Sequence, residues 1–290
     1  TGVVKVSGNN TEGGHVSPYQ WSPDSSRLAY AADLVTQIYS WRLFVTGADE
    51  EGSTNVSGDI VSNGSVQNGS ENSFSWSSDN KYLAFRADKS TDNVNELYVI
   101  DAESPEFTVT KVSGEVDEAD DVASFSWSHN GSLLEFSLDK RSSEAFELYV
   151  VNPSGDSLIS VSGDLAGAKV QSQIQAKWNS DSSKLVYTAA QNEDAVLEMF
   201  TVNVDGSDNQ KISPVLVDGG DISLFTWSAD STQVIYTADQ ETNDVHETYI
   251  VDESGQNNAK LSGTLTPGGS IQCIMATGTS LNGCYLKGEK

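Results

Sequence analysis

Short apolar runs alternate with polar clusters along nearly the whole chain. The runs follow a two-residue period and are rich in Val, Ile, Tyr and Phe, and clusters of Gly, Asn, Asp, Ser and Pro separate them. Such alternation is typical of β-strands, and such clusters are typical of turns. The 3.6-residue period of a helix is absent from the sequence. The pattern therefore predicts an all-β chain built from short strands.

The runs also recur in a larger unit that is marked by tryptophan. The segment "FSWSSDNKYLAF" is nearly rewritten as "FSWSHNGSLLEF" and again as "FTWSADSTQVIY". The marking residues stand at intervals of 55, 51, 51 and 49, at Trp21, Trp76, Trp127, Trp178 and Trp227. An aromatic residue follows nine positions after each tryptophan: Tyr30, Phe85, Phe136, Tyr187 and Tyr236. A second aromatic closes a later apolar run in each unit: Phe44, Tyr98, Tyr149, Phe200 and Tyr249.

Each unit thus holds four short strands, which is the layout of a β-propeller blade. We expect each tryptophan to lie on the innermost strand and to pack between neighbouring sheets, as core and not as a sugar platform. A polar residue stands where strand one must turn into strand two: Asp24, Asp79, Asn130, Asp181 and Asp230. Such residues cap turns by bonding to their own backbone two positions on, so we expect a structural role for them.

A sixth, weaker unit follows the fifth. Ungapped alignment places Ala276 under Trp227 and Tyr285 under Tyr236, so two strands of a sixth blade are expected. The segment "VVKVSG" near the N-terminus matches the fourth-strand ending of the other units. We therefore predict one domain over residues 1–290, a six-bladed propeller with an incomplete last blade. Its closing strand would be Val3, Val4, Lys5, Val6 and Ser7.

The chain has two cysteines, and both fall in this weak blade. Cys273 and Cys284 are placed on adjacent antiparallel strands with side chains on the same sheet face. A disulfide between them is geometrically allowed and would suit an oxidising compartment. Two reduced thiols are the alternative. We predict the disulfide and an extracellular or periplasmic location, with "TGVVKVSG" as a processed N-terminus.

The repeated "WSPDSSRLAY", "WSSDNKYLAF" and "WSADSTQVIY", with the later "LYVID" and "TYIVD", resemble the TolB-type propeller repeats of bacteria. The resemblance covers nearly the whole chain. It implies a propeller whose six-bladed members close their ring with a terminal strand. Members of this family serve as partner-binding domains, as substrate gates on prolyl-oligopeptidase-like enzymes and occasionally as polysaccharide lyases. The incomplete sixth blade departs from the family pattern.

The charge of the chain limits the classes of partner that it is expected to bind. There are 42 acids against 16 bases, which gives a formal net charge of −26. Nucleic acid and anionic membrane surfaces are therefore not expected partners, because both would repel the chain. No apolar run approaches 18 residues, so we expect no membrane insertion.

The acids concentrate in the loops before strand one and between strands two and three, which share one rim. Oxygen ligands at such spacings suit calcium, although no segment matches an EF-hand loop. We therefore predict a solvated acidic rim without a cofactor, with bound calcium as the alternative. The candidate ligands are Asp88, Asp120, Asp121, Asp139 and Asp239.

Catalytic motifs are lacking. The sequence has no GxSxG elbow, no P-loop and no dinucleotide fingerprint, and His15, His129 and His246 occupy different blade positions. We predict a non-catalytic binding scaffold, not an enzyme, that offers its channel mouth to a protein or glycan. One alternative is a structural subunit of a surface assembly that self-associates through the sixth blade by strand donation. Another is a polysaccharide lyase or hydrolase, although the rim has few bases to hold an acidic polysaccharide.

Overall fold

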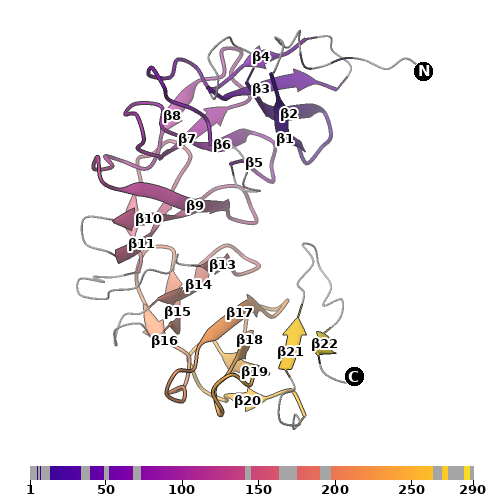
Figure 1. Cartoon of the computed structure of the whole chain (residues 1–290), viewed down its shortest axis with the longest axis vertical. Helices are drawn as coiled ribbons and strands as arrows, with labels where there is room; N and C mark the ends of the chain where they lie inside the picture. Colours follow the sequence, from indigo (N-terminus) through magenta and orange to yellow (C-terminus); the bar gives the residue numbers. More distant parts are fainter. Residues whose placement is uncertain are drawn as a thin grey trace. The chain divides into compact units, whose positions relative to one another are not determined.

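The computed structural model describes residues 5, 7, 14–33, 40–48, 52–67, 73–140, 145–162, 175–189, 197–263, 270–273 and 284–287. The described strands form five four-stranded antiparallel sheets and one two-stranded sheet. Strands follow chain order across each four-stranded sheet, as the sequence pattern predicts (Figure 1). The prediction of an all-β propeller built from four-stranded blades is confirmed, and the number of blades stays a prediction.

The chain divides into two compact units, Thr1–Ser143 with Glu147–Ser160 and Glu144–Phe146 with Val161–Lys290, and single-domain behaviour stays a prediction. The first three sheets contain β1 (Val16–Trp21), β2 (Arg27–Ala32), β3 (Arg42–Gly47), β4 (Thr54–Asn55), β5 (Phe74–Trp76), β6 (Tyr82–Ala87), β7 (Glu96–Asp101), β8 (Val109–Lys111), β9 (Asp121–Trp127), β10 (Leu134–Lys140), β11 (Ala145–Val151) and β12 (Ile159–Ser160). The others contain β13 (Ala176–Trp178), β14 (Lys184–Ala189), β15 (Glu198–Asn203), β16 (Gln210–Lys211), β17 (Ile222–Trp227), β18 (Gln233–Ala238), β19 (Glu247–Asp252), β20 (Ala259–Lys260), β21 (Ser270–Cys273) and β22 (Cys284–Lys287).

The two repeated aromatics of each unit stack on one another in the middle of its sheet. In the second sheet the strand register places Phe85 opposite Tyr98, and their ring centroids lie 5.4 Å apart. The other four sheets repeat this pair at centroid distances of 5.2 to 5.5 Å. The nine-residue step thus positions a stacked pair in every four-stranded sheet. Both rings are buried in the second, fourth and fifth sheets, whereas Phe44 and Tyr149 are only partly buried. The core role predicted for the tryptophans is confirmed for Trp76, Trp178 and Trp227, which are buried.

Three of the repeated tryptophans join neighbouring sheets through their indole N–H groups, whereas the buried indole N–H of Trp178 has no hydrogen-bond partner among the described residues. Trp76 donates to the carbonyl of Gln20 at 3.4 Å, and Trp127 donates to the carbonyl of Ser75 at 2.9 Å. In the other unit Trp227 donates to the carbonyl of Lys177 at 3.0 Å. The acceptor always precedes the tryptophan of the previous sheet. Trp21 differs, because 47% of its surface is exposed, whereas Trp76 is 5% exposed.

The turn between strands one and two repeats a single hydrogen-bond pattern, which confirms its predicted structural role. Asp79 Oδ1 accepts the Ser77 hydroxyl at 2.6 Å and the backbone N–H of Lys81 at 3.2 Å. The backbone N–H group two positions on is the donor to the equivalent side chain in every turn: Ser26 to Asp24, Ser132 to Asn130, Ser183 to Asp181 and Thr232 to Asp230.

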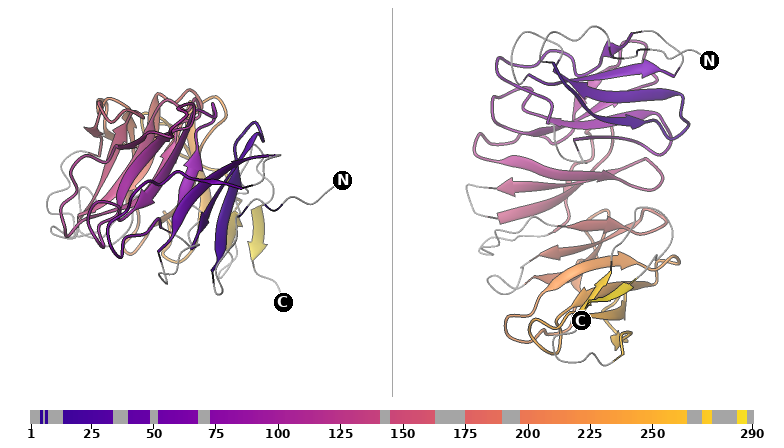
Figure 2. Two further views of the ribbon diagram at one scale, coloured as in Figure 1. Left: turned by 90° about the horizontal axis from the view of Figure 1, so that it is seen from above. Right: turned by 45° about the vertical axis from the view of Figure 1, so that its right-hand side comes forward.

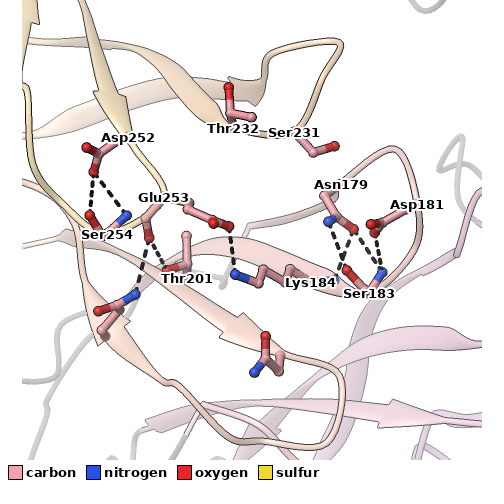
Figure 3. A network of polar contacts seen from close by, with 12 residues as sticks. Asn179, Asp181, Ser183, Lys184, Thr201, Ser231, Thr232, Asp252, Glu253 and Ser254 are labelled. Carbon is pink, nitrogen blue, oxygen red and sulfur yellow. Dashed lines mark hydrogen bonds and ion pairs between the residues drawn. The ribbon is translucent and has the colours of Figure 1, made fainter.

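Polar side chains also connect the fourth and fifth sheets. Lys184 Nζ lies 2.6 Å from Glu253 Oε2, and the Thr201 hydroxyl donates to the Glu253 carbonyl at 3.0 Å. Figure 3 shows these contacts beside the turn that is capped by Asp181. Within each sheet the strands run side by side, as the turned views show (Figure 2).

The last described strands form a two-stranded sheet, β21 with β22. Its register sets Cys273 directly opposite Cys284, a placement that brings Cα atoms within the reach of a disulfide. The disulfide itself stays a prediction. Of the predicted closing strand, Val3, Val4 and Val6 lie outside the described residues, and Lys5 and Ser7 are described outside any strand. Ala276 also lies outside the described residues.

In the described part of the chain, no helix is long and apolar enough to cross a membrane.

Candidate functional site

The five predicted calcium ligands are spread over three sheets and have mainly structural partners. Asp88 follows β6, and its Oδ1 accepts the Ser65 N–H at 2.5 Å while its Oδ2 accepts the Asn93 N–H at 3.2 Å. Asp121 Oδ1 accepts the Asn95 N–H at 2.6 Å, which links the second and third sheets. Asp139 lies opposite Asp121 in the sheet register, and Asp120 directly precedes β9.

The structure places a different set of ligand atoms together. Asp221, Asp239 and His246 each offer one ligand atom, and these atoms lie within 4.8 Å of one another. Among the described residues this is the one group of three or more such side chains with that spacing. We call it the blade-five group. Of the predicted ligands it contains Asp239, whereas Asp88, Asp120, Asp121 and Asp139 lie outside it.

Three loop junctions of the fifth sheet build the blade-five group. Asp221 directly precedes β17, Asp239 follows β18 and His246 directly precedes β19. The register pairs Ile222 with Ala238, so Asp221 and Asp239 lie opposite one another at the end of two adjacent strands. His246 Nε2 lies 3.5 Å from Asp221 Oδ1.

Asp239 is the fixed member of the blade-five group. It is 2% exposed, its Oδ1 accepts the Asp221 N–H, and its Oδ2 accepts the Asp244 N–H at 3.0 Å. Asp239 thus joins the loop before strand one to the loop between strands two and three, as Asp88 does in the second sheet. The side chains of Asp221 and His246 are more accessible, with exposed fractions of 59% and 33%.

Glycine permits the close approach of these two loops. A Cβ atom at Gly220 would lie 2.8 Å from the Asp239 carbonyl oxygen, which is closer than side chains tolerate. Gly219 has φ of +78°, and a Cβ there would lie 3.0 Å from Asn243 Nδ2. The "GGD" sequence therefore sets Asp221 tightly against the loop that carries Asp239 and leads to His246.

Three other buried acids, Glu96, Glu198 and Glu247, are each paired with a lysine. Glu96 is bound by Lys111 at 2.9 Å, Glu247 by Lys260 at 2.5 Å, and Glu198 by Lys211. A tyrosine two positions on, such as Tyr98 or Tyr249, donates to the same carboxylate. Burial raises the pKa of both tyrosines well above the usual range, and the adjoining glutamates raise it further.

Sequence reasoning missed the blade-five group because it treated the histidines as scattered. His15 is exposed, and its backbone carbonyl accepts the Asp33 N–H at 3.0 Å. The His129 carbonyl accepts the Ser78 hydroxyl at 2.8 Å. Only the strand register could have revealed that His246 lies beside Asp221. The register shows that "GGD" and "ADQETNDVH" meet at the same end of the fifth sheet.

No protein-family model matches the chain, and no curated protein matches it. Solved structures do resemble it. Dipeptidyl peptidase 4 of Porphyromonas gingivalis has a TM-score of 0.66 and 17% identity over 90% of this chain and 40% of that one. An oligogalacturonate lyase in complex with manganese has a TM-score of 0.52 and 13% identity over 83% of this chain and 63% of that one. TolB of Agrobacterium tumefaciens has a TM-score of 0.47 and 14% identity over 86% of this chain and 80% of that one.

These comparisons establish that the chain has a propeller fold. The chain spans less than two thirds of the peptidase and of the lyase that it resembles. The comparisons contradict the prediction of a non-catalytic binding scaffold, because the similar structures include a peptidase and a lyase. They favour the alternative of a carbohydrate-active enzyme over that prediction. The residue pattern had indicated a scaffold because the propeller repeat carries no catalytic motif of its own.

Proposed function

We propose that the chain is the propeller part of a secreted or periplasmic enzyme that cleaves a polysaccharide. The observation that carries this proposal is the approach of His246 Nε2 to Asp221 Oδ1, at 3.5 Å on accessible side chains. A carboxylate beside an imidazole orients the ring and stabilises its protonated form, which is the arrangement of a general base.

The chemistry favours elimination over two-carboxylate hydrolysis. Glycosidases hold their two carboxyl groups about 5 to 9.5 Å apart and use both. The ligand atoms of the blade-five group are within 4.8 Å, and both Asp239 oxygens already accept backbone N–H groups. In a lyase, His246 would remove the proton next to the sugar carboxylate. The glycosidic C–O bond then breaks as a C=C bond forms, and the departing oxygen takes a proton from solvent.

The test is cleavage of a panel of acidic and neutral polysaccharides by the chain. New C=C bonds, measured by ultraviolet absorbance, indicate a lyase, and new reducing ends without absorbance indicate a hydrolase. Replacing a general base lowers the rate about 10²- to 10⁴-fold, so we expect His246→Gln to lower the cleavage rate at least about 10²-fold. Asp218→Asn is the matched control, since Asp218 is an exposed acid of the same loop outside the blade-five group. Equal rates for His246→Gln and the control would refute the assigned base.

A second candidate is the propeller part of a larger peptidase. It is favoured by the TM-score of 0.66 to an enzyme of which the chain spans 40%. This candidate predicts no cleavage of any polysaccharide in the same assay. Binding of a protein or glycan at the channel mouth, and self-association through the sixth blade, stay predictions.

A further inference from the structure

We infer that the blade-five group binds a divalent transition-metal ion. One oxygen each from Asp221 and Asp239 and the Nε2 atom of His246 would be the protein ligands. This inference uses the side chains on which the proposed function rests but gives His246 another role, because a ring that binds an ion through Nε2 is a ligand and not a general base. It concerns binding and can be measured without a substrate.

The spacing of the ligand atoms fits one ion. Imidazole nitrogen and carboxylate oxygen bind zinc at about 2.0 to 2.2 Å, so two such ligands at a tetrahedral angle are about 3.4 Å apart. The distance from His246 Nε2 to Asp221 Oδ1 is 3.5 Å. The third ligand atom, from Asp239, lies within 4.8 Å of both. One ion could therefore contact all three atoms once the side chains rotate toward it.

The buried charge of Asp239 is an independent reason to expect a cation. Its carboxylate is 2% exposed and accepts hydrogen bonds from two neutral amides. A buried charge normally has a partner of opposite sign. Three buried glutamates, Glu96, Glu198 and Glu247, follow this rule with Lys111, Lys211 and Lys260. Among the ion pairs of the described residues, none joins Asp239 to a lysine or arginine.

Comparison of the sheets shows which positively charged side chain is lacking beside Asp239. The Arg42 guanidinium interacts electrostatically with Asp88, and the Arg86 guanidinium does so with Asp121. In each case the arginine comes from the sheet before the one that carries the aspartate.

The fifth sheet has no such arginine. Arg42 stands two residues before the second repeated aromatic, where the fourth sheet has Glu198. Arg86 directly follows the first repeated aromatic, where the fourth sheet has Thr188. Two acids of the fifth sheet therefore meet a histidine where the second and third sheets have an arginine. A bound divalent ion would supply the missing positive charge.

The ligand types favour a transition metal over calcium. Calcium takes six to eight oxygen ligands, whereas an imidazole nitrogen suits zinc, iron and similar ions, and manganese accepts carboxylates readily. Three protein ligands leave coordination positions for water or substrate oxygen. The exposure of Asp221 gives an ion a path from solvent. An ion held here would also provide the positive charge that an acidic polysaccharide needs on this rim.

The direct test is isothermal titration of the chain after treatment with EDTA and dialysis. Zn²⁺, Mn²⁺ and Ca²⁺ are titrated separately at about 0.15 M salt, which screens the exposed acids. We expect one Zn²⁺ or Mn²⁺ per chain, bound more tightly than Ca²⁺. Asp221→Asn and His246→Gln should each weaken binding at least tenfold, and Asp218→Asn should leave it unchanged. Equal binding in all variants, tighter Ca²⁺ binding, or no Zn²⁺ or Mn²⁺ binding would overturn the inference.

A second measurement guards against misfolded variants. Circular dichroism should give the same spectrum for wild type and variants, and Asp239 is left unchanged because it joins two loops. The bound ion should raise the melting temperature of wild type and Asp218→Asn, since a native-state ligand stabilises by mass action, but not that of His246→Gln. One bound ion without cleavage of any polysaccharide would keep this inference and remove the proposed function. Cleavage by a chain that binds no ion would keep the function and overturn the inference.

Discussion

At the scale of single residues, the turn carboxylates show how a small polar group organises a blade. Asp24 Oδ1 accepts the Ser22 and Ser26 hydroxyls at 2.6 and 2.8 Å and the Ser26 N–H at 3.0 Å. The Ser22 hydroxyl, followed by the donors of Ser26, lowers the pKa of Asp24 to about 2. The Ser228 hydroxyl likewise lowers the pKa of Asp230. The hydrogen bonds of the turn therefore stabilise the charged form of both carboxylates.

This predicts loss of stability in acid. Since the folded-state pKa is below the unfolded value of about 3.9, the stabilisation is complete above about pH 4. It is lost as the pH falls towards 2, where Asp24 protonates even in the folded chain. Chemical denaturation at stepwise pH checks this, and a midpoint that stays constant from pH 5 to pH 2 would contradict it.

The same turn predicts a difference between two substitutions at Asp79. Asn130 already fills the equivalent position and accepts the Ser132 N–H at 3.0 Å, so Asp79→Asn should keep the turn. Asp79→Ala removes the acceptor for Ser77 and Lys81 and should cost about 1 to 2 kcal/mol of unfolding free energy. Urea titration of both variants measures the difference. Equal losses would show that charge, and not hydrogen bonding, holds the turn.

At the scale of the blade, the third sheet neutralises its glutamate with a lysine from a different strand than the other sheets use. The lysine opposite the second aromatic in three other sheets, Lys111, Lys211 or Lys260, is Ser160 in the third. Glu147 is bound there by Lys140 at 3.0 Å, from the second strand instead of the fourth. The position of the lysine changes between blades, but the neutralisation of the glutamate is kept.

This compensation predicts a rescue. Lys140→Ala should destabilise the chain by about 1 to 2 kcal/mol, because the pair is partly buried and Glu147 would be left without a cation. Adding Ser160→Lys should restore most of the loss by rebuilding the arrangement of the other sheets. Lys81→Ala, at a more exposed pair, is the control and should cost little. Failure of Ser160→Lys to recover any stability would contradict the proposed equivalence.

The blades themselves could be predicted from sequence, but the blade-five group could not. Tryptophan spacing and the nine-residue aromatic step depend on contacts within a unit, so each copy repeats them. Asp221 and His246 are 25 residues apart and meet through the sheet register and a two-glycine approach that no period records. Asp239 was named for its position on the rim, but its partners are not the acids with which sequence had grouped it. The repeat therefore predicts the core, whereas the blade-five group depends on His246, which the other units do not repeat.

At the scale of the whole molecule, a net charge of −26 opposes compaction. Salt screens repulsion between exposed charges but acts weakly on buried pairs such as Lys111 with Glu96. Raising NaCl from about 0.02 to 0.3 M should therefore raise the melting temperature by roughly 2 to 4 °C, or about 1 kcal/mol. Calorimetry in NaCl and in KCl checks this, and the two salts should agree. A lower melting temperature in salt would mean that surface ion pairs outweigh the repulsion.

The tryptophan links between sheets have a consequence for how such a protein evolves. Their acceptors are the backbone carbonyls of Gln20, Ser75 and Lys177, three residues with unlike side chains. Because each indole N–H donates to a peptide carbonyl, mutation of these side chains leaves the indole hydrogen bond in place, although at Gln20 it would remove a second bond, from the Trp76 backbone N–H to the side-chain Oε1. After gene duplication each copy can thus acquire its own inner-strand side chains without loosening its neighbour. A chain of equal blades can in this way come to hold an unequal, one-sided centre.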